Sequence, residues 1–485
     1  MVGLAVVCAP LFIVSPAASQ SHPGPLTIEG LNARLDASAD VRAFGGVTIG
    51  AQNSLSSMFV HPATLFSLEG PQISIAGAHR DLSLRQEQHF APVRYYPNLS
   101  LLLEGLTDQI PDPDPTLIGF TPADSVQRTL DDIQPNWSRD DAQSLPLHAM
   151  VAVPFSAAGV RLVAGAGYVR YADLHHYDQN NNVMEPGVLA VRPLPILRPT
   201  DNNPLEVDWQ QSIRSREGMI HGYGGALAGH VEQIGLTLGI SGLLLNGSSD
   251  DFERLEDRGR LTFFANEFRV QPSSKRHTRR GTSDFSGFEL TLSGLLSSEF
   301  VSIGLALHAP TTITREFATQ VEIDTAGTTM TSRISGEDEL RLPWRGSAGL
   351  LLRPRPQLHL GLQYEWRPFG RATYTDVDGV ESTPWESASV FAVGAQYTPA
   401  SWVVVRAGLR READVFVPDG SPMDIEPVTY RVYSVGLGLR YQGIRWSVAY
   451  EMARMSYQDI WSSAFSDNEH RIHRIATDLS YTLPW

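Results

Sequence analysis

The sequence of 485 residues contains a single cysteine, Cys8, which lies close to the N-terminus. The chain beyond it has no thiol, which excludes a disulfide framework and cysteine-based metal sites there. Long apolar runs are missing as well, because after residue 20 no run approaches the roughly 20 apolar residues that a transmembrane helix needs. The net charge of −15 excludes the basic surface that is typical of nucleic-acid-binding proteins. We therefore expect no nucleic acid among the partners.

The first residues have the composition of a secretory signal. An apolar stretch at Leu4–Val14 is followed by the small residues of Pro16–Ser19, which predict a signal peptide over residues 1–19. The stretch is too short to span a membrane as a helix. Cys8 follows the bulky Val7, which argues against a lipoprotein anchor. An exported chain without a helical anchor is periplasmic, secreted or a barrel.

What the sequence has instead is strict alternation, seen most clearly in YRVYSVGLGLRY at residues 430–441. One face is apolar and is closed by a tyrosine at each end: Tyr433, Val435, Leu437, Leu439 and Tyr441. The other face is small or charged: Ser434, Gly436, Gly438 and Arg440. This alternation predicts a β-strand between two environments. Soluble strands are usually about 5–6 residues long, whereas a membrane-spanning strand needs about 9–11 and carries aromatic residues at both interfaces.

The same alternation recurs along the chain and predicts an all-β fold, an antiparallel transmembrane β-barrel of about fourteen strands. We interpret residues 92–104 as part of the first outer loop, because one more strand would put the two ends of the barrel on opposite rims. The expected strands are 72–84, 145–154, 159–172, 217–229, 232–245, 284–296, 301–308, 340–353, 357–366, 386–398, 401–413, 430–441, 445–452 and 475–485.

The connections between these strands alternate in length, which indicates short periplasmic turns on one rim and long extracellular loops on the other. Short turns are expected at 157–158, 230–231, 297–298, 355–356, 399–400 and 442–443. Long polar loops are expected at 173–216, 246–283, 312–339, 371–385, 414–428 and 458–470. A soluble β-sandwich has no reason to segregate its loops in this way.

The two ends of the mature chain differ from the strands between them. Residues 20–70 do not alternate and are apolar enough to pack, so we expect an N-terminal plug in the lumen of a barrel formed by residues 71–485. The last strand ends with Tyr481, Leu483 and Trp485 at alternate positions. This ending resembles the signal read by the outer-membrane insertion machinery. The alternative is an ordinary last strand that happens to end on tryptophan.

Polar residues at expected lumen positions are candidate lining residues, although most lumen walls are polar. They are His359, Gln363, Glu365, Arg406, Arg410, Arg440, Arg445, Glu451 and Asp478. A two-residue hairpin at 442–443 places Arg440 directly opposite Arg445, and like charges at that spacing need a counter-charge. We hypothesise that a plug carboxylate supplies it, from Glu29, Asp36 or Asp40.

Motifs of enzymes and metal sites are absent from the sequence. Asp178, Asn180 and Asn182 have the spacing that opens a calcium loop, but the later glycine and glutamate are out of place. Neither G-x-S-x-G nor H-E-x-x-H occurs. Isolated histidines such as His148, His221 and His308 cannot be assembled into a Ser-His-acid set from the sequence. We therefore expect no catalytic residue, no metal and no cofactor, and keep a barrel enzyme as the weakest alternative.

Two segments resemble a known family. Residues 43–70, AFGGVTIGAQNSLSSMFVHPATLFSLEG, are similar to the plug segment of the long-chain fatty acid and hydrophobic compound transporters of the outer membrane. His61, Pro62 and Ala63 stand where that family has Asn-Pro-Ala, so the hydrogen bond of the asparagine is in doubt. Residues 340–366 resemble a repeated pattern of the family, in which two strands are joined by a short turn. The resemblance implies a fourteen-stranded barrel, a plug in its lumen and passive uptake of hydrophobic compounds.

These observations lead to one expected function and one alternative. We expect a bacterial outer-membrane channel for passive uptake of hydrophobic compounds such as long-chain fatty acids. Its partners would be outer-membrane lipid, a hydrophobic ligand and the barrel insertion machinery. The alternative is a non-transporting barrel of the same superfamily that serves as a docking partner in protein export or surface attachment.

Overall fold

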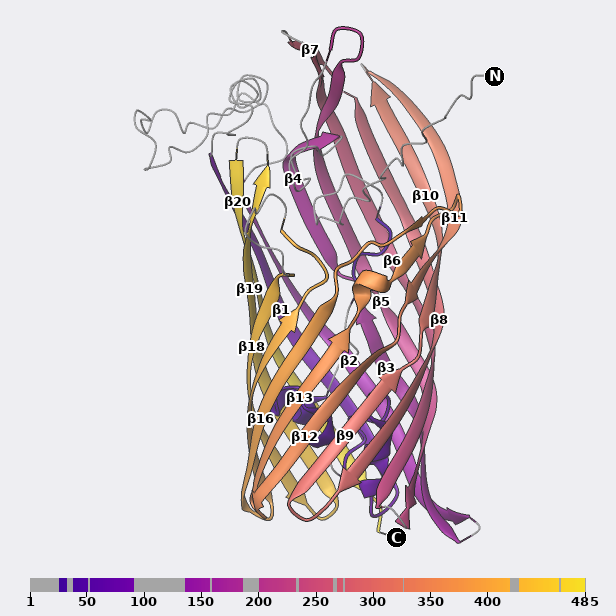
Figure 1. The fold of residues 1–485 in the computed structure, drawn as a ribbon, viewed down its shortest axis with the longest axis vertical. Helices are drawn as coiled ribbons and strands as arrows, with labels where there is room; N and C mark the ends of the chain where they lie inside the picture. Colours follow the sequence, from indigo (N-terminus) through magenta and orange to yellow (C-terminus); the bar gives the residue numbers. More distant parts are fainter. Residues whose placement is uncertain are drawn as a thin grey trace, which may run out of the picture.

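The structure is a computed structural model in which the strands close into a single antiparallel barrel (Figure 1). The last strand pairs with the first, so the sheet has no free edge within the barrel. The described residues are 26–32, 38–50, 53–90, 136–157, 159–185, 200–232, 235–264, 268–273, 275–325, 327–418, 427–461 and 464–484. Residues 92–104 and Trp485 lie outside them, as do the residues of the predicted signal peptide.

The described chain begins with three short helical turns inside the barrel and continues as β-strands, with one further helical turn between β13 and β14. The helical turns are α1 (Ala39–Ala43), η1 (Thr48–Gly50), η2 (Pro62–Ser67) and η5 (Phe369–Arg371). The first half of the strands comprises β1 (Gln72–Phe90), β2 (Trp137–Ala157), β3 (Val160–Asp173), β4 (His176–Glu185), β5 (Leu205–Val231), β6 (Leu236–Phe263), β7 (Phe268–Pro272), β8 (Arg276–Ser297), β9 (Val301–His308) and β10 (Thr311–Thr325). The second half comprises β11 (Thr328–Leu342), β12 (Arg345–Arg355), β13 (Leu358–Arg367), β14 (Thr373–Thr375), β15 (Glu381–Ser382), β16 (Ala388–Ala400), β17 (Val403–Ala413), β18 (Thr429–Tyr441), β19 (Ile444–Trp461) and β20 (Ala464–Thr482).

The barrel has fourteen strand positions, as the sequence predicted. Three of the fourteen barrel strands are each interrupted and consist of two consecutive segments: β9 with β10, β11 with β12, and β13 with β14. For example, β9 and β10 both pair with β8 on one side and with β12 and β11 on the other. Strands β4, β7 and β15 add short pairings at the outer end. The expected short turns are confirmed to within a few residues. At the turn after β18, Gln442 and Gly443 both have positive φ, as a two-residue hairpin requires.

Several segments that we expected to be loops are strands. Residues 246–263 continue β6 and residues 312–339 form most of β10 and β11, so these strands stand tall above the rest of the barrel (Figure 1). Opposite charges face each other across this extension, as Glu253 does Arg279 and Glu256 does Arg276. Most residues on both faces of the extension are polar, although Met330 and Ile334 of β11 are exposed, so the regular hydrophobic alternation of a lipid-facing strand is lost there.

A belt of apolar side chains surrounds the lower part of the barrel and points outward. On β18, Tyr433 is 49% exposed and Val435 is 55% exposed, whereas Ser434 between them is buried. Large apolar residues are exposed in the same way on β1, β2, β5, β6, β8, β9, β13, β16, β17, β19 and β20. An apolar belt of this kind is the lipid-facing surface of a membrane barrel. Among the described residues, no helix is both long and apolar enough to cross a membrane.

The described residues between 38 and 70 lie inside the barrel and are largely buried (Figure 1). Helix α1 contacts β17 to β20, η1 contacts β9, β12 and β13, and η2 contacts β3, β5, β6 and β8. We call residues 38–70 the plug core and residues 26–32 the strap.

A row of glycines lets the plug core approach the wall closely. A Cβ atom on Gly394 would meet the ring of Phe44, and one on Gly408 would overlap the backbone of Gly45. Gly361 pairs with Gly394, which in turn pairs with Gly408, so these three glycines form one row across β13, β16 and β17. Glycine is required here because the backbone of the plug lies against the backbone of the wall.

Candidate functional site

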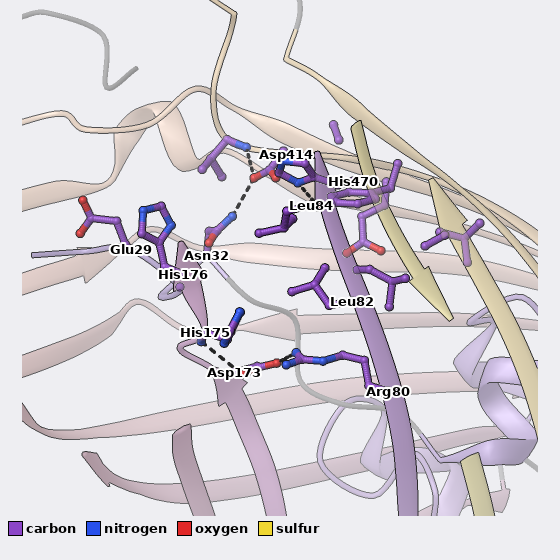
Figure 2. Close-up of a pocket in the computed structure, with 18 of the residues that line it drawn as sticks. Glu29, Asn32, Arg80, Leu82, Leu84, Asp173, His175, His176, Asp414 and His470 are labelled. Atoms are coloured by element: carbon purple, nitrogen blue, oxygen red, sulfur yellow. Dashed lines mark hydrogen bonds and ion pairs between the residues drawn. The ribbon is translucent and has the colours of Figure 1, made fainter. Parts of the chain in front are cut away.

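A cavity of 380 Å³ lies inside the barrel, between the plug and the outer ends of the strands (Figure 2). Apolar residues that line it include Ile28, Leu82, Leu84, Val415, Phe416, Val432, Ala453 and Ile472. Charged residues that line it include Glu29, Arg80, Asp173, Arg214, Arg410, Glu412, Asp414, Glu451 and Arg474. Figure 2 shows Glu29 and His176 at one end of the cavity and Leu82 and Leu84 farther along it. The volume is in the range of small-molecule sites, about 300–1,000 Å³.

The floor of the cavity is an ion-pair cluster that joins the plug to the wall. Glu451 on β19 is buried and forms ion pairs with Arg42 of α1 at 3.0 Å, Arg410 of β17 at 3.2 Å and Arg474 of β20 at 3.4 Å. A buried carboxylate needs such partners, because an unpaired charge in the interior is strongly destabilising. Glu451 therefore lies in the lumen, where the sequence placed it, and contacts the plug directly.

Other predicted lumen residues also contact the plug. Gln363 on β13 accepts hydrogen bonds from the backbone N–H of Thr48 at 2.8 Å and from its hydroxyl at 2.9 Å. Asp478 on β20 accepts a hydrogen bond from the backbone N–H of Asp40 at 3.2 Å. These contacts fix η1 and the start of α1 against the wall, so the plug is fastened on two sides of the lumen.

Within the described residues, no plug carboxylate forms a direct ion pair with the arginine pair, although the charge of Asp40 acts on Arg445 at longer range. Arg440 does face Arg445 across the hairpin, as predicted. However, no ion pair within the described part of the chain joins either arginine to Glu29 or Asp40, and Asp36 lies outside that part. Arg445 instead donates to the backbone carbonyl of Asn53, and Arg440 is exposed. The plug therefore contacts the arginine pair directly through the carbonyl of Asn53, and Asp40 supplies counter-charge without a direct ion pair.

The remaining lumen candidates form contacts within the wall. Arg406 donates through Nε to Gln396 at 2.8 Å, and Gln396 lies 3.4 Å from the ring of His359. Glu365 accepts a hydrogen bond from Arg367 at 2.7 Å. At the end of the chain, Tyr481 and Leu483 are exposed at the lower rim. The described residues contain no group of three or more histidine, cysteine, aspartate or glutamate side chains that could hold a metal ion.

The His61–Pro62–Ala63 motif opens η2 and presses against β6 and β8. Ala63 donates its backbone N–H to the hydroxyl of Ser293 at 2.8 Å, and a Cβ on Gly239 would meet the backbone of Pro62 and Ala63. His61 is buried, and within the described residues neither of its ring nitrogens has a hydrogen-bond partner. The motif therefore contacts the wall through its backbone, and the described residues give the histidine ring no hydrogen bond to the wall.

The strap crosses the outer part of the lumen and is held by arginines of the wall. Arg216 on β5 donates to the carbonyls of Thr27 and Glu29, each at 3.1 Å. Arg315 on β10 donates to the carbonyl of Leu26 at 2.7 Å. Arg214 forms an ion pair with the Glu29 carboxylate. The strap thus relies on one ion pair and several backbone contacts.

Two carboxyl groups at the strap, Glu29 on the strap itself and Asp414 of the barrel beside Asn32, have opposite pKa shifts. Burial alone would raise the pKa of Glu29, but the neighbouring positive charges, that of Arg214 foremost, hold it well below its usual range. Burial raises the pKa of Asp414, in the outer loop after β17, to about 6. Asn32 of the strap donates to Asp414 at 2.8 Å. Glu29 is therefore charged at neutral pH, and the charge of Asp414 changes within the physiological range.

Sequence reasoning missed the arginines of the strap site. Arg214 and Arg216 lie two residues apart in SIRSREG, on the same face of β5. We expected this stretch to be part of a loop, because its alternation is between polar residues only. The signal that was available is the spacing of the two arginines, which places both side chains on one side of a strand.

Comparisons with known proteins agree with this fold. No protein-family model and no curated protein matches the chain. A FadL homologue from Pseudomonas aeruginosa of known structure is 13% identical, with 92% of this chain and 98% of the homologue covered, at a TM-score of 0.60.

Two further solved structures are similar over nearly their whole length. The toluene transporter TodX of P. putida is 11% identical, with 93% of this chain and 100% of TodX covered, at a TM-score of 0.54. The toluene transporter TbuX of Ralstonia pickettii is 14% identical, with 92% of this chain and 98% of TbuX covered, at a TM-score of 0.51. At such identities the similarity concerns the fold, and at that level it confirms the resemblance seen in the sequence.

Proposed function

We propose that the protein is a passive channel of the bacterial outer membrane that takes up hydrophobic compounds such as long-chain fatty acids. The observation that carries this proposal is the cavity beside the plug, whose lining combines apolar residues with charged ones. A rigid polar pore would hold water along its whole length and would not favour an apolar solute. The toluene transporters with the same fold support the same solute class.

In this proposal the compound enters between the outer extensions, rests in the cavity and then moves past the plug. Burial of its apolar part against Leu82, Leu84 and Phe416 provides the binding free energy, at about 25 cal/mol per Å² of apolar surface removed from water. The plug core blocks free diffusion of polar solutes, because it fills the lumen below the cavity. No chemical conversion is required, so we propose that the protein is not an enzyme.

The docking alternative relies on a different surface. A docking barrel would present an exposed apolar rim above the membrane and a filled lumen. Here the extension formed by β6, β8, β10 and β11 is charged, and an internal cavity remains beside the plug. These observations favour transport over docking. Lipid contact along the apolar belt and recognition of the last strand by the insertion machinery remain part of the proposal.

A cysteine introduced into the cavity tests whether hydrophobic compounds bind there. Because Cys8 is the sole native cysteine, Leu84→Cys gives a single thiol, which lines the cavity, in a Cys8→Ser background. We expect dodecanol to slow the reaction of this thiol with a water-soluble maleimide. Thr331→Cys on β11, which is exposed above the belt, is the matched control and should react at the same rate with and without dodecanol. Equal rates at Leu84→Cys would contradict the proposal.

A further inference from the structure

The strap contains a carboxylate that points into the cavity. Glu29 lines the cavity together with Arg214 and His176, and its ion pair with Arg214 is largely shielded from water, with side-chain exposures of 18% for Glu29 and 5% for Arg214. The rest of the strap is held through its backbone carbonyls by Arg216 and Arg315. The Glu29 carboxylate also accepts a hydrogen bond from the backbone N–H of Thr27 at 2.7 Å, so its displacement would remove some of the contacts that hold the strap.

The site around Glu29 has more hydrogen-bonding capacity than Glu29 uses. Within the described residues, the buried Nε of Arg214 and Nε2 of His176 have no hydrogen-bond partner. Buried polar groups are almost always paired in proteins, so such atoms in a cavity wall indicate a missing partner. Arg214 presents a planar fork of donors that matches a carboxylate. His176 is neutral, since burial lowers its pKa to about 3, and adds a neutral polar contact.

Two further carboxylates act on Arg214, both more weakly than Glu29: Glu253, and Asp178, which lies opposite Arg214 across β4 and β5. Arg216 is neutralised by Asp251, which it contacts through Nε at 2.7 Å and Nη2 at 2.9 Å. Glu253 forms an ion pair with Arg279 at 3.2 Å. If the Glu29 carboxylate moved away, Arg214 would lose the one direct ion pair that it has within the described residues and would attract another carboxylate.

Apolar residues line the cavity farther along from Glu29, and charged residues such as Arg80 and Asp414 lie among them. Figure 2 places Leu84 and Leu82 farther along the cavity from Glu29 and His176. A ligand with a carboxylate at Arg214 would therefore have apolar residues available for its chain. A neutral hydrocarbon would bind against these apolar residues and would not displace Glu29 from Arg214.

We propose that Glu29 acts as an internal competitor: the plug's own carboxylate occupies a site at Arg214 and His176 that accepts the carboxylate of an amphipathic ligand. The ligand class is a long-chain carboxylate, and binding of the carboxylate displaces Glu29 and loosens the strap. This inference rests on the proposed uptake of hydrophobic compounds and names the solute that the cavity prefers. The competing explanation is that Glu29 and Arg214 are a structural clamp.

The test compares two ligands that differ in the head group. Equilibrium binding of radiolabelled dodecanoate and dodecanol is measured at pH 7.5 on the full barrel in lipid nanodiscs, with binding to empty nanodiscs subtracted. Glu29→Gln keeps the shape of the side chain and removes its charge. If the site is free of Glu29 in about 10% of wild-type molecules, this variant should bind dodecanoate about tenfold more tightly. Its affinity for dodecanol should not change.

Two variants serve as controls. Glu69→Gln makes the same change at an exposed position of the same N-terminal segment, outside the cavity, and should bind both ligands as the wild type does. Arg214→Gln should lose the preference for dodecanoate. Heat-modifiable migration in gels verifies that each variant is folded.

A second measurement does not depend on the folding of the Glu29 variant. Thr27→Cys in the strap, in a Cys8→Ser background, is labelled with a water-soluble maleimide. Dodecanoate should accelerate this labelling, because loss of the Glu29 contacts loosens the strap, and dodecanol should not.

Each other outcome overturns the inference in a distinct way. Equal changes for both ligands in Glu29→Gln would identify a clamp and leave the proposed function standing. Binding of dodecanol without binding of dodecanoate in any variant would remove the carboxylate site alone. Absence of binding of both ligands would overturn the proposed function and the inference together.

Discussion

At the scale of single residues, the stability of the plugged state depends on buried charges with several partners. Glu451 forms ion pairs with Arg42, Arg410 and Arg474 at once. Replacing it with alanine leaves these arginines in a buried site with less counter-charge, and removal of one partner of a buried pair costs about 3–5 kcal/mol. We expect Glu451→Ala to lower the free energy of unfolding by an amount of this order, measured by urea unfolding in lipid vesicles.

The control for this substitution is the removal of a solvent-exposed ion pair on the surface of the protein. Glu206 lies 3.5 Å from Arg260, and both side chains are about half exposed, at 57% and 47%. Exposed pairs contribute about 0–1 kcal/mol. A loss in Glu451→Ala no larger than that in Glu206→Ala would show that the buried cluster does not stabilise the plug.

Asp414 gives the molecule a dependence on pH at the outer end of the cavity. Its pKa is raised from 3.8 to about 6 by burial, so between these values the folded protein binds a proton that the unfolded chain has released. The stability that this proton provides is present at low pH and is lost as pH rises through 6. Relative to wild type, Asp414→Asn should gain about 2–3 kcal/mol in free energy of unfolding between pH 4 and pH 7.5.

Unfolding curves of both proteins at several pH values check this expectation. The asparagine retains an oxygen that can accept the hydrogen bonds from Asn32 and Val415, so the comparison isolates the charge. Parallel pH profiles for the two proteins would contradict a raised pKa for Asp414.

At the scale of elements, the row of glycines determines how the plug fits the wall. Gly408→Ala places a Cβ where the backbone of Gly45 lies, and overpacking of this kind costs about 1–3 kcal/mol. We expect a barrel that still assembles but holds its plug loosely, seen as faster leakage of a small sugar from proteoliposomes.

Gly294→Ala on β8 is the matched control for the glycine row. Its Cβ would meet side chains at 3.7 Å, which is ordinary contact distance. This variant should leak no more than wild type. Equal leakage of both alanine variants would mean that the close backbone approach does not hold the plug.

The apolar belt predicts that the cost of introducing a charge depends on how deep in the membrane the substituted residue lies. Val435→Arg puts a charge on the outward face of β18, at a cost of about 2–4 kcal/mol if it lies at the middle of the bilayer. Thr331→Arg, on the exposed extension of β11, should be tolerated because it lies in water. Heat-modifiable migration compares the folded fractions of the two variants. Equal yields would argue against a lipid environment around Val435.

At the scale of the whole molecule, the sequence predicts the part of the fold that contacts lipid. The strand count and the short turns follow from alternation, because apolar residues must face lipid at every second position. The outer extensions of β6, β10 and β11 could not be found in this way, since water surrounds both of their faces and removes the alternation.

The site was predictable to a smaller extent. Glu451, Gln363 and Asp478 were identified as lumen residues because they interrupt the small side chains of the inner face. Their contacts with the plug depend on how residues 38–50 fold inside the barrel, which no periodicity encodes. The sequence also does not indicate which arginine Glu29 contacts, because that depends on the path of the strap inside the barrel. A pairing of Glu29 with Arg445 was therefore as plausible from the sequence as its pairing with Arg214.

The central claim is that hydrophobic compounds cross the outer membrane through this barrel. The initial rate of uptake of radiolabelled dodecanoate and dodecanol is compared in cells that lack the gene and in cells that carry it, with assembled barrel quantified in both. The account predicts faster uptake when the barrel is present, with no change in the uptake of a small polar sugar. Uptake at the same rate in both strains, with the barrel assembled in the outer membrane, would contradict it.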